Sequence, residues 1–193
     1  MKSVCVYAGS NPGTDPDYVV QAQKLGQLIA ERGYRLIYGG SKVGLMGAIA
    51  DSVITHGGKV VGVMPRGLFR GEIVHRSITQ LIEVDSMHER KAKMSELADG
   101  FIALPGGLGT FEELFEMLCW SQIGIHRKPI ALYNTRQYYD PLMQLITHSV
   151  QEGFSGSNHL QLLCCTSDPE ELLSFMETYQ PPAMENKWKQ LEP

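Results

Sequence analysis

The sequence predicts an α/β protein whose central parallel sheet, of about seven strands, is covered by helices on both faces. Short apolar, β-branched runs alternate with longer helical patterns along the chain, which is typical of repeated β-α-β units. Glycine-rich segments follow three of the apolar runs, where such a sheet turns from strand into helix. The 193 residues, 43% hydrophobic and 20% charged, suffice for one domain with its own core.

The alternation predicts each element in order. We expect strands near residues 3–8, 34–39, 59–64, 78–84, 100–105, 129–133 and 160–165. We expect helices near residues 16–32, 44–56, 86–98, 109–123, 138–152 and 168–178. Because no linker, repeat or low-complexity segment interrupts this order, residues 1–180 are predicted to form a single domain. The polar, proline-punctuated residues 181–193 are predicted to be a flexible tail.

Composition and the first strand exclude several classes of protein. The apolar run from Val4 to Tyr7 is too short for a signal peptide, so we expect a first strand and a cytoplasmic protein. No apolar run approaches the roughly 18 residues that cross a bilayer, and no membrane partner is expected. A net charge of −4 argues against a nucleic-acid surface. The four cysteines have no metal-ligand spacing and are expected to be reduced.

Three glycine clusters are predicted to meet at one edge of the sheet. Ala8-Gly9-Ser10 follows the first strand, Gly39-Gly40-Ser41 follows the second with Gly44 and Gly47 close behind, and Gly106–Gly109 follows the fifth. Since ligands bind outside the carboxyl ends of parallel strands, these loops predict one ligand-binding crevice. The second cluster matches neither the dinucleotide fingerprint nor the P-loop, which argues against a nicotinamide oxidoreductase and an ATP hydrolase.

The helix expected at 86–98 begins with a capping signature and brings two cations toward the crevice. Ser86 can cap its N-terminus, with Glu89 at the capping-box position. Arg90 and Lys91 follow one turn into the helix. A guanidinium offers a planar fork to phosphate or ribose oxygens, whereas an ammonium offers a point charge. A solvated basic face is the alternative interpretation of this pair.

The stretch from Leu104 to Glu113 is the most informative part of the chain. Its glycines allow backbone N–H groups to approach an anion, and the helix that follows offers the positive end of its dipole. Glu112 and Glu113 would then lie within about one helical turn of a bound phosphate. Glu116 lies one turn further on. Carboxylates in a first turn often serve only the helix dipole, so that alternative stays open.

An anion cradle, an arginine and paired carboxylates suit cleavage of a glycosidic bond, which passes through a cationic sugar. A 5′-phosphorylated N-riboside would place its phosphate at Gly106 to Thr110 and its ribose against Glu112 and Glu113. The residues do not identify the base. The six histidines lack ligand spacing, so no metal is expected, and no serine or cysteine nucleophile has a local signature.

At Pro105 to Glu113, which reads P-G-G-x-G-T-x-x-E, the chain resembles the Lonely Guy family of cytokinin riboside 5′-monophosphate phosphoribohydrolases. Similar segments are Gly39–Ser41, Val43–Gly47, Met87–Lys91, Trp120–His126 and Lys128-Pro129, and the resemblance spans roughly residues 3–155. It implies a Rossmann-like fold, usually a homodimer, without a cofactor. It also implies hydrolysis of nucleoside 5′-monophosphates, either AMP or N6-prenylated AMP, to free base and ribose 5-phosphate.

The resemblance further implies that Arg90 and Glu113 are the catalytic residues. The expected substrate-binding residues are Ser10, Gly40, Gly44, Met46, Glu72, Met87, Lys91, Gly106, Gly107, Leu108, Gly109, Thr110 and Glu112. A non-catalytic nucleotide or cofactor carrier, as found among relatives, is the alternative function. Members are often labelled lysine decarboxylases, but the sequence shows no pairing of a Schiff-base lysine with a partner for a pyridoxal ring nitrogen.

Overall fold

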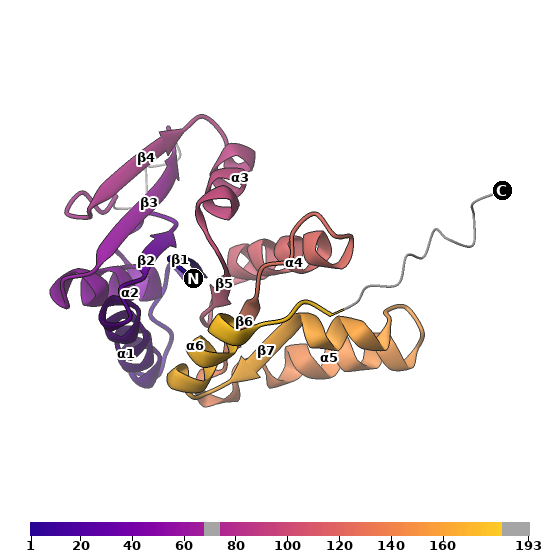
Figure 1. Ribbon diagram of the computed structural model, residues 1–193. Helices are drawn as coiled ribbons and strands as arrows, with labels where there is room; N and C mark the ends of the chain where they lie inside the picture. Colours follow the sequence, from indigo (N-terminus) through magenta and orange to yellow (C-terminus); the bar gives the residue numbers. More distant parts are fainter. Residues whose placement is uncertain (68–73, 183–193) are drawn as a thin grey trace.

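The computed structural model describes residues 1–67 and 74–182, and these form a seven-stranded parallel sheet between two layers of helices (Figure 1). The strands are β1 (Ser3–Tyr7), β2 (Arg35–Tyr38), β3 (Lys59–Pro65), β4 (Gln80–Val84), β5 (Phe101–Ala103), β6 (Ile130–Tyr133) and β7 (Leu163–Thr166). Their order in the sheet is β4-β3-β2-β1-β5-β6-β7, and every pair is parallel. The expected Rossmann-like α/β fold is confirmed.

The helices divide between the two faces of the sheet. They are α1 (Asp17–Glu31), α2 (Gly44–Thr55), α3 (Met87–Leu97), α4 (Leu108–Gln122), α5 (Asp140–Gln151) and α6 (Pro169–Thr178), with short 3-10 helices η1 (Thr135–Gln137) and η2 (Ser157–Leu162). Helices α1, α2 and α6 pack over one face, and α3, α4 and α5 over the other. Alternate residues of β1 enter the two cores, as strand geometry requires. Within residues 1–67 and 74–182, no helix is long and apolar enough to cross a membrane.

One expected strand is wrong over its first half. Residues 160–162 belong to η2, and β7 begins at Leu163. On the side of β6 away from β5, its four residues pair with Leu163–Thr166, so the residues before Leu163 have no partner strand there. A local hydrogen bond from the Gly156 N–H to His159 Nδ1, of 3.1 Å, favours the 3-10 turn instead. Two expectations, the contact of Glu72 and the tail from residue 183, lie outside the described residues.

The order of the strands places a crevice between the ends of β1 and β5. Strands β2, β3 and β4 follow one another on one side of β1, and β5 lies on the other side of β1. Connections therefore run in opposite directions at this point, which is where ligands bind in open sheets. Backbone hydrogen bonds join the loops there, from Gly9 N to Pro105 O at 3.1 Å and from Leu45 N to Gly9 O at 3.0 Å.

Candidate active site

A cleft of about 290 Å³ opens at this crevice. The three glycine clusters contribute to its walls, as the sequence predicts, together with side chains from α2, β3 and α3. The lining residues are Ala8, Gly9, Ser10, Gly39, Met46, Pro65, Met87, Arg90, Gly107, Leu108, Gly109, Thr110 and Glu113. Apolar and charged groups thus meet in one cleft.

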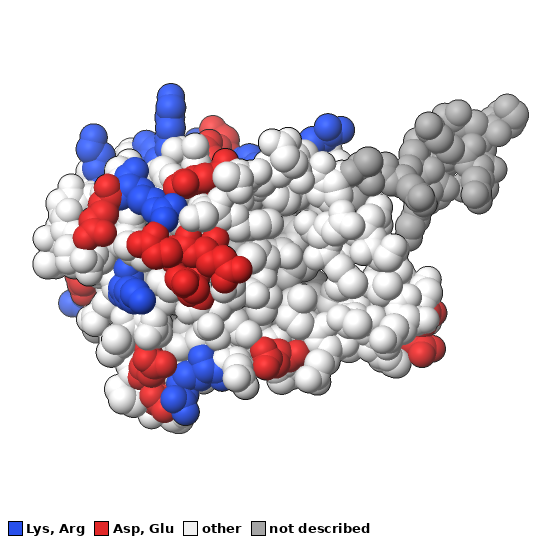
Figure 2. All heavy atoms as spheres, turned by 60° about the horizontal axis from the view of Figure 1, so that its bottom comes forward, with Lys and Arg blue, Asp and Glu red and all other residues white. Residues whose placement is uncertain are grey.

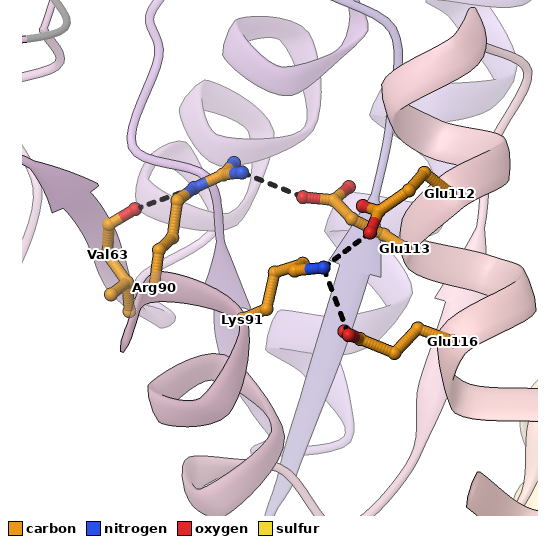
Figure 3. A network of polar contacts seen from close by, with 6 residues as sticks. All are labelled: Val63, Arg90, Lys91, Glu112, Glu113 and Glu116. Carbon is orange, nitrogen blue, oxygen red and sulfur yellow. Dashed lines mark hydrogen bonds and ion pairs between the residues drawn. The ribbon is translucent and has the colours of Figure 1, made fainter. Parts of the chain in front are cut away.

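Arg90 and Glu113 form an ion pair in the wall of the cleft (Figure 3). Arg90 Nη1 donates to Glu113 Oε1 at 2.8 Å, and Arg90 Nε donates to Val63 O, at the carboxyl end of β3, at 3.2 Å. The two side chains are only 13% and 10% exposed, so the pair is largely shielded from water. The helix cap that orients Arg90 is the expected one, because Ser86 Oγ accepts from Glu89 N at 3.1 Å.

Gly39 makes room for this arginine. A Cβ added at Gly39 would lie 2.1 Å from Arg90 Nη2, where no heavy atom can fit. The glycine of the second cluster therefore does more than turn the chain, since it allows the guanidinium to lie against the end of β2. Gly39 belongs to a loop of the predicted crevice but was not among the expected substrate-binding residues, although its position beside Gly40 was a usable signal.

A second set of ion pairs lies beside the first. Lys91 Nζ donates to Glu112 Oε1 and, at 3.0 Å, to Glu116 Oε1 (Figure 3). These three side chains do not line the cleft. Helix α3 thus presents two cations to three carboxylates of α4, and both helices are held together next to the site. Glu116 was not among the expected site residues, although it follows Glu112 at helical i,i+4 spacing.

The N-terminus of α4 opens into the cleft without a side-chain cap. The N–H groups of Gly107, Leu108, Gly109 and Thr110 find no acceptor among the described residues, as is usual for the first turn of a helix. A Cβ at Gly107 or Gly109 would meet no atom within 4 Å. Packing therefore leaves space beside these N–H groups, and the arrangement suits an anion.

Burial controls the electrostatics of the carboxylate in the cleft. It raises the pKa of Glu113 above the ordinary value of 4.5, and the neighbouring Arg90 charge only partly opposes this effect. The pKa of Lys91 is also raised, chiefly by its hydrogen bond to Glu112. Lys91 is therefore held as an ammonium, and Glu113 is a carboxylate whose negative charge is poorly solvated.

The structure separates the expected binding residues into two groups. Ser10, Met46, Met87 and residues 107–110 line the cleft. Gly40, Gly44 and Gly106 are not among the lining residues: Gly40 O accepts from His75 N at 2.9 Å, Gly44 packs against Ser10, and Gly106 packs against Thr110. Glu72 lies outside the described residues, and the binding roles of all these residues stay predictions. Pro65 lines the cleft and was missed, although it ends a strand neighbouring β2.

The chain is similar to known proteins over most of its length. A family described as "Possible lysine decarboxylase" matches residues 46–176. A cytokinin riboside 5′-monophosphate phosphoribohydrolase of Rhodococcoides fascians is 49% identical over 154 residues, 79% of this chain and 78% of that protein. One from Arabidopsis thaliana is 43% identical over 180 residues, 93% and 84% of the two chains. The solved molybdenum cofactor binding protein of Rippkaea orientalis shares the fold, with a TM-score of 0.68 at 22% identity over 92% and 97% of the chains.

Proposed function

Because this chain belongs to the family of the cytokinin riboside 5′-monophosphate phosphoribohydrolases, we propose that it hydrolyses the N-glycosidic bond of adenosine 5′-monophosphate or its N6-modified derivatives. The products are the free base and ribose 5-phosphate. The observation that carries the proposal is the shielded Arg90–Glu113 pair beside the uncapped N-terminus of α4. The Arg90–Glu113 pair suits a cationic sugar, and the N-terminus of α4 suits the phosphate of that sugar.

The phosphate is proposed to bind at the start of α4. The free N–H groups of residues 107–110 would donate to its oxygens, and the helix dipole favours its negative charge. The base would lie against the apolar part of the cleft, formed by Met46, Pro65 and Met87. This placement leaves the ribose between the two, beside Glu113.

In the proposed reaction, the bond between C1′ of the ribose and the base nitrogen breaks and its electron pair leaves with the base. The carboxylate of Glu113 stabilises the positive charge that develops on the sugar and orients the water whose oxygen bonds to C1′. One proton of that water is released from the oxygen, and the departing base gains a proton. Arg90 uses Nε and Nη1 for Val63 and Glu113, so Nη2 is available to the nucleotide.

The two alternative functions have less support. A lysine that forms a Schiff base must lose its proton to attack, whereas the pKa of Lys91 is raised by Glu112. Lys91 is therefore a poor decarboxylase nucleophile. The solved molybdenum cofactor binding protein is only 22% identical and shares the fold alone. The cleft with Arg90 and Glu113 favours an enzyme over a nucleotide carrier.

The test of the function compares AMP with adenosine. We expect purified protein to release adenine and ribose 5-phosphate from AMP, and to act at least about 100-fold less efficiently on adenosine, which lacks the phosphate. N6-isopentenyl AMP, assayed alongside, measures the preference for the base. Equal rates on AMP and adenosine would contradict the proposed anchoring at α4.

The pH dependence of turnover should report the pKa of Glu113. At AMP concentrations well below KM, we expect kcat/KM to fall on acidification with a midpoint above 4.5, because burial raises this pKa in the free protein and the carboxylate is the active form. The raised pKa means that the folded state binds this proton more tightly than the unfolded chain, so its uptake does not destabilise the fold. Unfolding measured at the same pH values is the control. A midpoint at or below 4.5 would contradict the assignment.

Gly109→Ala is expected to change stability and affinity in opposite ways. Gly109 is an exposed residue of the first turn of α4, and a Cβ there meets no protein atom. Alanine should therefore stabilise the helix by up to about 1 kcal/mol. Its methyl group would occupy the space proposed for the phosphate and raise KM for AMP about tenfold or more. Urea unfolding and steady-state kinetics measure the two effects, and an unchanged KM would contradict the phosphate position.

We also propose that the protein is a cytoplasmic homodimer that associates through α5. All four cysteines are free thiols, in keeping with a reducing compartment. Helix α5 contains no buried residue, and an apolar groove between α4 and α5 is lined by Phe115, Leu118 and Leu145. Figure 2 shows charged side chains gathered on the side of α1 and α6, while the side of α5 is nearly free of charge. A second copy could cover this surface.

Leu145→Glu should dissociate the proposed dimer. Leu145 is 60% exposed, so the substitution should cost little in the folded monomer, but it would place a charge in the interface. Val20→Glu is the matched control, because Val20 is 54% exposed and lies on α1, on the other face of the sheet. Light scattering after size exclusion measures the mass. A monomeric wild type, or a dimer that survives Leu145→Glu, would contradict the proposal.

A further inference from the structure

Two neighbouring tyrosines bind the turn that precedes α4. They follow η1, at the carboxyl end of β6, and Tyr138 lines a second hollow together with Gly106 and Gly107. Tyr138 Oη donates to Gly106 O at 2.5 Å, and Tyr139 Oη donates to Leu104 O at 2.6 Å. Neither tyrosine lines the cleft, so both would act on the site through the backbone of the turn.

The hydrogen bonds of Tyr138 and Tyr139 differ in whether the peptide that each one holds carries an N–H group. In a trans peptide, the N–H of one residue points opposite to the C=O of the residue before it. No peptide in the described part of the chain is cis. By holding Gly106 O, Tyr138 turns the Gly107 N–H in the opposite direction, away from its own hydroxyl, and Gly107 is one of the residues that line the cleft. Tyr139 holds the carbonyl before Pro105, a residue that has no N–H.

We propose that Tyr138 is a positioning residue that orients the Gly107 N–H toward the phosphate of the substrate. The inference rests on the proposed function for the identity of the anion. The peptide it controls joins two glycines, which have the widest choice of backbone angles, so this unit can rotate more readily than any other in the turn. A second hollow of about 210 Å³, lined by Tyr18, Gly106 and Gly107, leaves room for that rotation.

The ring of Tyr138 is fixed on several sides. It stacks on Phe111 of α4, with centroids 6.4 Å apart and planes 22° apart. It meets Tyr18 edge to face at 6.1 Å and Tyr139 edge to face at 5.1 Å. A side chain held by rings from α1 and α4 can set the direction of a hydrogen bond without losing rotamer freedom when the anion binds.

The backbone before Tyr138 supports the same interpretation. Arg136 and Gln137 adopt φ angles of 54° and 61°, a left-handed conformation that is unfavourable for residues other than glycine. A hydrogen bond from Tyr139 N to Asn134 Oδ1, of 2.7 Å, and an ion pair between Arg136 Nε and Asp15 Oδ2, of 3.2 Å, hold the chain on either side of this conformation. The kink directs the chain so that two consecutive tyrosines reach the turn.

Tyr138→Phe and Tyr139→Phe form a matched pair, because each removes one hydroxyl that binds one backbone carbonyl. We measure the Kd of ribose 5-phosphate by calorimetry, kcat and KM for AMP, and stability by urea unfolding. We expect Tyr138→Phe to weaken ribose 5-phosphate about tenfold and to raise KM more than it lowers kcat. We expect Tyr139→Phe to lower the free energy of unfolding at least as much as Tyr138→Phe does, because the Tyr139 hydroxyl is buried. The Kd of ribose 5-phosphate should change less than twofold in Tyr139→Phe.

The binding arm separates this inference from the proposed function. If the wild type binds ribose 5-phosphate but does not cleave AMP, the proposed function fails, and the comparison of the two variants still tests Tyr138. Equal Kd values for Tyr138→Phe and the wild type would overturn the inference. So would an equal loss of affinity in the two variants, because the effect would then be a general loosening of the turn, and so would a wild type that does not bind ribose 5-phosphate.

Discussion

Replacing Glu113 by glutamine is expected to lower kcat for AMP by about three orders of magnitude or more, with the fold and nucleotide binding largely preserved. The amide oxygen can still accept from Arg90 Nη1, so the contact between α3 and α4 survives. The negative charge is lost, and Glu113 lies where water screens charges poorly, which makes its attraction to a cationic sugar strong. Steady-state kinetics and the Kd of ribose 5-phosphate measure the two parts of the expectation.

Glu116→Gln is the matched control for this experiment. It makes the same chemical change on the same helix, but Glu116 faces Lys91 and does not line the cleft. We expect it to retain turnover within about tenfold of the wild type. Turnover that survives in Glu113→Gln, or that falls equally in both variants, would contradict a catalytic role for Glu113.

Removal of Arg90 is expected to impair both activity and stability. Arg90→Ala should lower kcat/KM for AMP by at least about 100-fold, because it removes the cation that holds the nucleotide and offsets charge on the departing base. It also leaves the shielded carboxylate of Glu113 without its counterion, which should cost about 3 kcal/mol of unfolding free energy. Urea unfolding and steady-state kinetics measure the two losses.

The double variant Arg90→Ala/Glu113→Gln identifies the source of the instability. If the cost arises from an unpaired buried charge, neutralising Glu113 should recover most of the lost stability without recovering activity. A solvated Arg90, the alternative interpretation of the sequence, would leave stability and activity unchanged in the single variant. Stability losses that simply add would indicate that Arg90 acts through packing against Gly39 and Val63 rather than through its charge.

The sequence predicted most of the fold because its local signals agree with one another. Apolar runs, helix caps and glycine turns each mark an element boundary. The segment at 160–162, where a local turn replaces strand pairing, was placed wrongly, and the strand expected at 100–105 is shorter, at Phe101–Ala103. Periodicity reports which side of an element is buried, but not which residue of another element it meets. The family resemblance therefore predicted that Arg90 and Glu113 lie in one crevice. That the Arg90 guanidinium donates to both Val63 O and Glu113 could be seen only from the tertiary packing.

The same limit explains the residues that changed place. Lys91 and Glu112 bind each other beside the cleft, a contact that the sequence did not indicate, and their contact with substrate stays a prediction. Tyr138 has no signature in the sequence, since its effect depends on the direction of one peptide in another loop. The sequence does not distinguish Gly39 from Gly109, but Gly39 makes room for the Arg90 side chain, whereas Gly109 has open space beside it. Only the positions of surrounding atoms distinguish these roles.

Hydrolysis is tested by a reaction with the protein in excess over AMP or N6-isopentenyl AMP. Under this condition a slow enzyme still converts all of its substrate, whereas a carrier binds the nucleotide and returns it intact. We expect free base and ribose 5-phosphate in equal amounts with the wild type, and bound, uncleaved nucleotide with Glu113→Gln. Quantitative recovery of uncleaved nucleotide from the wild type would contradict the proposed hydrolysis, and nucleotide recovered bound to the protein would favour a carrier.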